Sequence, residues 1–217
     1  MSDAETMAAS VREAREHTLE RTLMFTDAAV AIALTLLVLP LVDVAGEVGD
    51  SSVWDVITDH WQDFFSFVLS FVVISSLWSV HRALWELLDD YNGVLFVLNT
   101  FWLLAIVFLP VPTALLNTGS GLSATGTRLY LGTMVVAAIM MTAQTWWVLR
   151  HPQLRRVHAT HDVMRDRMDG SLRATFVQAL ALGVSFLSPA WGLSTLWLLA
   201  VIDRIPLPRR FRTESSG

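Results

Sequence analysis

Two oxygen-bearing side chains, Asp27 and Thr35, lie within the apolar run ERTLMFTDAAVAIALTLLVLPLVD at residues 20–43. A carboxylate inside the hydrocarbon of a bilayer costs about 2.5–3.5 kcal/mol at mid-depth, so it usually has a partner and a role. A threonine is weaker evidence, because its hydroxyl can donate to a carbonyl of its own helix. Asp27 is therefore the first candidate for a site.

The aliphatic side chains around Thr35 follow helical spacing. At 100° per residue, Ile32, Leu36 and Leu39 fall within about 60° of one another, with Thr35 on the flank of the same stripe. Asp27 projects about 140° away from Ile32, onto another face. Periodicity alone favours lipid contact or helix packing for this stripe, and if the stripe lines a pathway, Asp27 does not point into it.

A partner for Asp27 is expected near the end of the next apolar run, SSLWSVHRALWELL. This run brings His81 and Arg82 to the same edge of the membrane as Asp27. We predict that Asp27 fastens two helices and is bonded either to His81 or to Arg21 of its own helix. An intramembrane enzyme would need an acid and a base at depth. Asp27 with His81 is the one candidate pair, and no nucleophile accompanies it, so we predict that the protein is not an enzyme.

The composition places the chain in a bilayer. Of its 217 residues, 53% are hydrophobic and 16% are charged, which gives more apolar surface than one soluble core can bury. The formal charge of −5 argues against a nucleic-acid partner, and the absence of cysteine excludes disulfides and thiolate metal ligands. His151, His158 and His161 invite a metal interpretation, but no HExxH-type framework accompanies them, and we predict no metal site.

We predict an all-α integral membrane protein with six transmembrane helices. A bilayer core of roughly 30 Å requires about 20 helical residues. The expected spans are 22–43, 61–80, 93–115, 127–149, 172–188 and 190–206, and the last two are a short hairpin or one broken element. The corresponding domains are a cytoplasmic N-terminal segment (1–20), a transmembrane domain (21–206) and a cytoplasmic C-terminal tail (207–217).

Loop charges orient the spans. The connection at 43–63 contains six acids and no arginine, whereas the connection at 150–173 contains six arginines. The positive-inside rule places the second connection in the cytoplasm. Both termini then face the cytoplasm, and the loop at 150–171 resembles a surface helix.

Three stretches carry a family resemblance: RTLMFTDAAVAIALTLLVLPL from Arg21, LWSVHR at 77–82, and NTFWLLAIVFLPVPTALL at 99–116. They resemble the RxxxFSD signature, the W-x-x-H-(H/R) motif and the N-rich, P-x-P-T third span of the transmembrane protein 175 potassium channels. Thr26 stands where this family usually has serine. Pro40 stands where many bacterial members have glutamate, a role that Asp43 could take at the outer mouth.

The resemblance implies a potassium-permeable channel whose first spans line a central pore. Single six-span chains of this family assemble as homotetramers. By motif position, Ile32, Leu36 and Leu39 match the hydrophobic constriction and Thr35 a polar layer that contributes to selectivity. The residues that match the helix-packing motif are Arg21, Phe25, Thr26, Asp27, Trp78, His81 and Arg82.

The resemblance also implies K⁺ as the permeant ion, no cofactor, and the plasma membrane of a prokaryote. Because aliphatic rings cannot replace a hydration shell and the TVGYG filter is missing, we expect moderate selectivity for K⁺ over Na⁺. A secondary transporter and a membrane scaffold protein are the alternatives. Internal repeats and mid-membrane charges, which are typical of transporters, are not evident.

Overall fold

The structure is a computed structural model that describes residues 3–46, 52–117 and 121–202. Within these ranges the protein consists of helices, and its β structure is limited to one isolated bridge between Leu88 and Arg155. The all-α prediction agrees with this architecture. The helices are α1 (Asp3–Leu36), α2 (Leu39–Gly46), α3 (Val53–Asp59), α4 (Trp61–Trp85), α5 (Gly93–Phe108), α6 (Pro110–Ala114), α7 (Ala124–Arg150), a short 3₁₀ helix (Pro152–Leu154), α8 (His161–Ser185) and α9 (Pro189–Ile202).

Four stretches of the described chain are long and apolar enough to cross a membrane. They are His17–Gly46, Trp61–Trp85, Gly93–Ala114 and Ala124–Arg150. These stretches include the first four predicted spans, and the remaining two predicted spans correspond to parts of α8 and α9. The predicted C-terminal tail at 207–217 lies outside the described residues.

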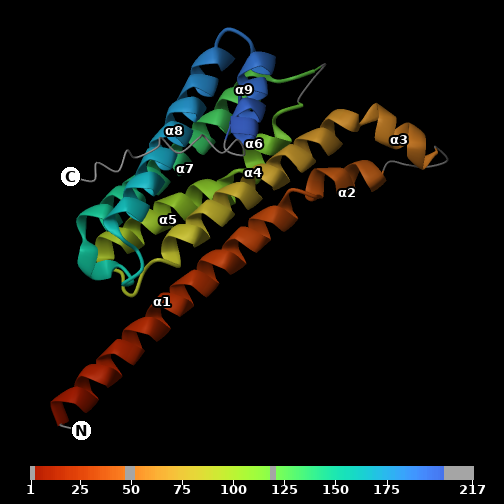
Figure 1. The fold of residues 1–217 in the computed structure, drawn as a ribbon. Helices are drawn as coiled ribbons and strands as arrows, with labels where there is room; N and C mark the ends of the chain where they lie inside the picture. The colour runs from red at the N-terminus through yellow and green to blue at the C-terminus, as the bar shows by residue number, and fades with distance from the viewer. Residues whose placement is uncertain (1–2, 47–51, 118–120, 203–217) are drawn as a thin grey trace, which may run out of the picture.

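Figure 1 shows how the helices are arranged. α7 packs against α5 on one side and against α8 on the other, and α9 folds back on α8 as the second arm of a hairpin. α1 lies obliquely along α4 and α5, and its N-terminal part extends beyond the rest of the bundle. α1 is continuous across the predicted domain boundary at residue 20.

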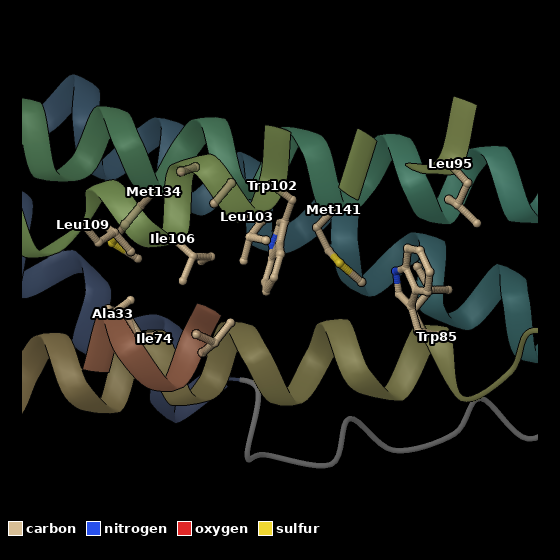
Figure 2. Close-up of a cluster of buried hydrophobic side chains, with 14 of the residues drawn as sticks. Ala33, Ile74, Trp85, Leu95, Trp102, Leu103, Ile106, Leu109, Met134 and Met141 are labelled. Carbon is tan, nitrogen blue, oxygen red and sulfur yellow. The ribbon is translucent and has the colours of Figure 1, made fainter. Parts of the chain in front are cut away.

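The buried core lies between α4, α5 and α7 and holds the packing side of α1 in place (Figure 2). Trp102 and Ile106 of α5 are fully buried there, beside Met134 of α7. Ala33 of α1 and Ile74 of α4 close the cluster from the other side. α1 is thus joined to the bundle through a small residue, which allows the helices to approach closely.

Pro110 explains why the third predicted span is broken. α5 ends at Phe108 and α6 begins at Pro110, because a proline has no N–H to donate and is tolerated at the start of a helix. The start of α7 then packs against α6 so closely that a Cβ on Gly126 would lie 2.0 Å from the Leu115 carbonyl oxygen. Glycine is required at this approach of two backbones.

The fifth predicted span, 172–188, corresponds to the later part of a longer helix. α8 starts at His161, so the second half of the predicted loop at 150–171 is the first part of a continuous helix. The Thr160 hydroxyl caps this helix by accepting from the Val163 N–H, and Asp162 in the first turn is favourable beside the helix N-terminus. Hydropathy missed this boundary because the first turns of α8 are polar.

The turn between α8 and α9 is tight, as the sequence suggested. Pro189 opens α9, and a Cβ on Gly192 would lie 2.6 Å from the Ser185 Cβ. The two helices therefore form a hairpin and not one broken element.

Candidate functional site

One face of α1 forms its packing seam against α4 and α5. The seam residues recur at spacings of three, four and seven, which is the spacing of one helix face. They are all buried: Leu19, Thr26, Val30, Ala33 and Leu37.

The opposite face of α1 carries the predicted constriction residues. Ile32 is 59% exposed and Leu36 is 39% exposed, and Thr35 between them is also exposed. On a helical projection Thr35 lies about 170° from the centre of the packing seam and Ile32 about 130° from it. The helix therefore presents Ile32 and Thr35 away from its own subunit, and Leu36, about 90° from the centre of the seam, lies at the edge of this face.

The Thr35 hydroxyl is anchored to its own helix. Its Oγ1 donates to the Ile32 carbonyl oxygen at 2.8 Å. Because this bond uses the one hydroxyl proton, the two lone pairs of the exposed oxygen are left as acceptors. A bare cation or its hydration water could be bound by such an oxygen.

α1 ends at Leu36, and this interrupts the predicted stripe. Pro40 has no N–H, and in a continuous helix its ring would clash with the Leu36 carbonyl. The chain instead turns at Leu37 and Val38, where the Val38 N–H donates to the Thr35 carbonyl at 3.3 Å, and resumes as α2. Leu39 remains 53% exposed, and Asp43 is exposed on α2.

Asp27 joins α1 to α4, although not through the partners predicted. The Trp78 indole donates to Asp27 Oδ1 at 2.7 Å, and Arg82 Nη1 lies 3.7 Å from Asp27 Oδ2. Arg82 also donates through Nε to Glu86 at 3.0 Å. The predicted partners, His81 and Arg21, were both wrong. His81 and Trp78 lie three residues apart on α4, and the indole is the group that reaches the carboxylate.

His81 takes part in a second polar network behind α1. His81 Nε2 lies 2.6 Å from Asn99 Oδ1 of α5, and Asn99 Nδ2 donates to Thr26 Oγ1 at 3.1 Å. The Thr26 hydroxyl in turn donates to the Thr22 carbonyl at 2.9 Å. All three side chains of this network are buried. Because the amide nitrogen of Asn99 is the donor to Thr26, its oxygen must accept, and the His81 proton therefore lies on Nε2.

Aromatic rings fix the orientation of the His81 imidazole. The ring of Trp102 is stacked on it with centroids 4.0 Å apart, and that of Trp85 lies 5.4 Å away. The Trp85 indole donates to Gln144 Oε1 of α7 at 2.8 Å. The network behind α1 is thus continued into the centre of the bundle.

Two other residues of the predicted packing motif do not contact the bundle core. Phe25 is 67% exposed, about 20° from Ile32 on the helical projection. Arg21 is exposed one turn earlier. Within one subunit, Phe25 belongs to the outward face and not to the seam.

Asn99 belongs to this site, although no role was predicted for it from the sequence. It is the first residue of the third motif, and a side-chain amide in the middle of an apolar helix is costly without a partner. The same signal that singled out Asp27 could have identified it. Tyr91 had no such signal: its hydroxyl accepts from Thr22 Oγ1 at 2.9 Å, across a loop that periodicity does not describe.

Between Ile32 and Leu39, the exposed side chains offer only apolar contact and one hydroxyl per chain, that of Thr35. Among the residues that the structure describes, no three histidine, aspartate or glutamate side chains converge as a metal site. His151, one of the histidines considered for such a site, is instead bonded through Nδ1 to the Trp147 carbonyl oxygen at 2.8 Å.

The part of the chain that contains this face is similar in sequence to known proteins. A family model described as the endosomal/lysosomal potassium channel TMEM175 matches residues 21–110, which include the outward face, Asp27 and the network behind it. A potassium channel of Streptomyces collinus is 27% identical over 201 residues, which are 86% of this chain and 93% of that protein. A potassium channel of Chamaesiphon minutus is 31% identical over 99 residues, which are 42% of this chain and 46% of that protein.

Solved structures share the fold. The crystal structure of a lysosomal potassium-selective channel TMEM175 homolog from Chamaesiphon minutus matches with a TM-score of 0.69 and 21% identity, over 86% of this chain and 96% of that one. A crystal structure of a variant of the potassium channel MtTMEM175, in complex with a nanobody–MBP fusion protein, matches with a TM-score of 0.57 and 16% identity, over 83% of this chain and 87% of that one.

The family model, the full-length relative and the shared fold agree with one another. The family that they identify is one of potassium channels and not of enzymes. The apolar helices of this chain are long enough to cross a membrane. The chain is thus similar over residues 21–110 to the TMEM175 potassium channel family, and it shares the fold of solved members of that family.

Proposed function

We propose that four copies of this chain form a potassium-permeable cation channel of moderate K⁺ selectivity, with α1 of each copy facing a central pore. The observation that carries the proposal is the exposure of Ile32, Thr35 and Leu36 on a helix whose opposite face is packed against its own subunit. One copy of α1 cannot enclose a pathway for ions, so the function requires the homotetramer.

The constriction acts by excluding water. Rings of Ile32, Leu36 and Leu39 offer no oxygen ligands, and a narrow apolar ring closes a pore by steric contact or dewetting. Thr35 supplies the one polar layer in this part of the pore. Its hydroxyl proton is held by the Ile32 carbonyl, so the oxygen is presented to a passing cation.

The polar networks behind α1 set the rotation of the pore helix. Asp27 is tied to Trp78 and Arg82 of α4, and Thr26 is tied to Asn99 of α5. A helix held at two adjacent residues, each by a different neighbouring helix, cannot rotate Ile32 out of the pore without breaking both contacts. Phe25, which is exposed in the single subunit, packs against a neighbouring copy in this arrangement.

The predicted topology completes the proposal. The chain crosses the plasma membrane of a prokaryote six times, α8 and α9 serve as the last two spans, and both termini lie in the cytoplasm. Residues 21–206 form the channel domain between the cytoplasmic segments 1–20 and 207–217. Asp43 then lies at the outer mouth, where its charge raises the local cation concentration. The channel needs no cofactor, and its partners are its own copies, lipid and K⁺.

Reversal potentials in planar bilayers test this function. Purified protein is reconstituted and measured under K⁺/Na⁺ gradients, together with Ile32→Asn and Thr35→Ala. Matched controls exist on other helices: Ile139→Asn changes an exposed isoleucine of α7, and Thr100→Ala removes an exposed threonine of α5 that also donates to its own backbone.

We expect wild type to pass K⁺ in preference to Na⁺. Ile32→Asn should raise the conductance several-fold because water can enter the constriction. Thr35→Ala should reduce the preference for K⁺, and both controls should behave as wild type. A silent wild type from which neither substitution draws current, or a monomer by light scattering, would favour the transporter or scaffold function instead.

A further inference from the structure

Arg128 is a positively charged side chain near the first turn of α7, at the end of the bundle where α8 meets α9. Its guanidinium carbon lies 4.7 Å from the ring centroid of Phe186, the residue that caps the C-terminus of α8. This geometry is that of a cation–π contact, which orients a guanidinium without neutralising it. The contact leaves the charge of Arg128 to be balanced elsewhere.

Nothing in the described part of the chain balances that charge. Arg128 forms no ion pair with a described carboxylate, and its buried Nε has no hydrogen-bond partner there. Two other arginines do have partners: Arg156 Nε lies 3.5 Å from Asp89 Oδ1, and Arg173 Nε donates to the Asp169 carbonyl at 3.1 Å. An unpaired charge at the edge of an apolar bundle is costly, so an anion from outside the subunit is expected.

The side chains around Arg128 are those of a surface that faces lipid. Phe186 is 64% exposed, Leu187 is 89% exposed and Trp191 is 70% exposed, all at the α8–α9 turn or in the first turn of α9. Leu129, beside Arg128 in the sequence, is also exposed. Aromatic and aliphatic side chains at the end of membrane helices lie at the level of the lipid headgroups. The anion nearest to Arg128 in a bilayer is therefore a lipid phosphate.

We propose that Arg128 binds the phosphodiester of an anionic phospholipid at the membrane edge where α7 begins. The guanidinium donates to the phosphate oxygens, a pairing that its planar fork matches, and Phe186 holds it at the required angle. Leu187 and Trp191 contact the acyl chains and the glycerol region of the same lipid. The site lies on α7 and the α8–α9 hairpin and does not depend on α1 lining a pore.

Native mass spectrometry of the detergent-solubilised full chain tests the site. The protein is titrated with phosphatidylglycerol, phosphatidylcholine or inorganic phosphate, and bound molecules per chain are counted. The variants are Arg128→Gln, which removes the charge, and Phe186→Leu, which removes the ring. Arg173→Gln is the matched control, because it removes an arginine whose partner is a carbonyl of its own helix.

We expect one tightly bound phosphatidylglycerol per wild-type chain. Arg128→Gln should weaken its binding roughly tenfold, as expected for one lost charge-assisted contact, Phe186→Leu should weaken it less, and Arg173→Gln should leave it unchanged. Equal binding by wild type and Arg128→Gln overturns the proposal. So does a loss in Arg173→Gln as large as that in Arg128→Gln, or inorganic phosphate that displaces the lipid at equal concentration.

A second measurement covers the case in which Arg128→Gln fails to fold or to assemble. The melting temperature of wild type is compared in phosphatidylglycerol and phosphatidylcholine nanodiscs, because a ligand that binds the folded state stabilises it. A higher value in phosphatidylglycerol supports the site, and equal values overturn it. If Arg128→Gln folds but dissociates, and wild type shows equal values in the two lipids, the anion belongs to a neighbouring chain and not to lipid.

Discussion

α1 and α7 are both long apolar helices, yet their subunit covers them to very different extents. In an apolar 18-residue window of the stretch His17–Gly46, which holds the second part of α1 and α2, 17% of the residues are buried, compared with 44% in such a window of α7. α7 is surrounded by α5, α6, α8 and α9, whereas α1 rests against α4 and α5 along one seam. α7 is therefore the structural centre of one chain, and α1 has a face that only another molecule can cover.

The polar side chains of the two helices differ in the same way. On α7, Tyr130 and Gln144 face inward, and both contact groups on α4: Ser70 Oγ donates to the Tyr130 hydroxyl at 3.4 Å and Trp85 to Gln144 at 2.8 Å. On α1, Thr26 faces the bundle while Thr35 faces away from it. These polar side chains of α7 stabilise its own subunit. On α1, Thr26 anchors the helix to the bundle and Thr35 lies on the outward surface.

The sharpest test of this contrast compares two leucines. Leu131 of α7 is fully buried and Leu36 of α1 is 39% exposed. Leu131→Ala should lower the free energy of unfolding by roughly 2–5 kcal/mol because it leaves a cavity, and Leu36→Ala should lower it by less than about 1 kcal/mol. Denaturant unfolding of the dissociated chain in mixed micelles measures both. Equal losses would mean that the exposed face of α1 is covered within its own subunit.

A backbone contact of α7 gives the next largest effect. Gly126→Ala places a Cβ against the Leu115 carbonyl and should destabilise the chain by roughly 1–3 kcal/mol through overpacking. Gly132→Ala is the control on the same helix, since a Cβ there has nothing within 4 Å and alanine is the better helix former. Melting temperatures in one detergent separate the two. A Gly126→Ala protein as stable as Gly132→Ala would show that α6 moves away at no cost.

Asp27 tests how α1 is attached to the bundle. Asp27→Ala leaves the Trp78 indole without its acceptor and should cost roughly 1–3 kcal/mol. Asp27→Asn keeps an acceptor for the indole and loses the partly exposed Arg82 pair, which should cost less than about 1 kcal/mol. A double-mutant cycle with Trp78→Phe measures the contact itself.

The Asp27 variants also test whether the carboxylate acts on helix packing or on ions. A coupling energy near zero would remove Trp78 as the partner of Asp27. Asp27→Ala protein that assembles normally but loses K⁺ selectivity would show that the carboxylate acts on ions and not on helix packing.

Some features of the fold and of the candidate site were predictable from the sequence, and others were not. Four of the six predicted spans followed from composition and coincide with apolar stretches long enough to cross a membrane. Helical spacing placed Ile32 on a stripe with Thr35 at its flank, but it did not decide between helix packing and an outward position, which only the structure shows. Asp27 was correctly expected to join two helices. Its partner was not predictable, because His81 and Trp78 lie on one helix at similar depth and only tertiary packing decides which side chain reaches the carboxylate.

The remaining differences have physical causes of the same kind. The break after Leu36 depends on Pro40, which signalled a bend but not where the helix would resume. A surface helix was predicted in the 150–171 connection, but not that it continues into the fifth span, because hydropathy separates the polar first turns after Thr160 from the apolar part of the same helix. Asn99 and Tyr91 became site residues through contacts with α1, and no pattern in a single sequence specifies a contact between distant segments.

The smallest expected effect concerns Asp43, on the exposed surface of α2 beyond the break. In the proposed tetramer, four carboxylates at the outer mouth attract cations, and Asp43→Asn should reduce the K⁺ current by less than about twofold in low salt. At about 1 M salt the Debye length is near 3 Å, so the mutant and wild type should conduct equally. Single-channel conductance across a series of KCl concentrations measures this. An effect that persists at high salt would place Asp43 in direct contact with the ion, and the constriction would then extend from α1 past Pro40 into α2.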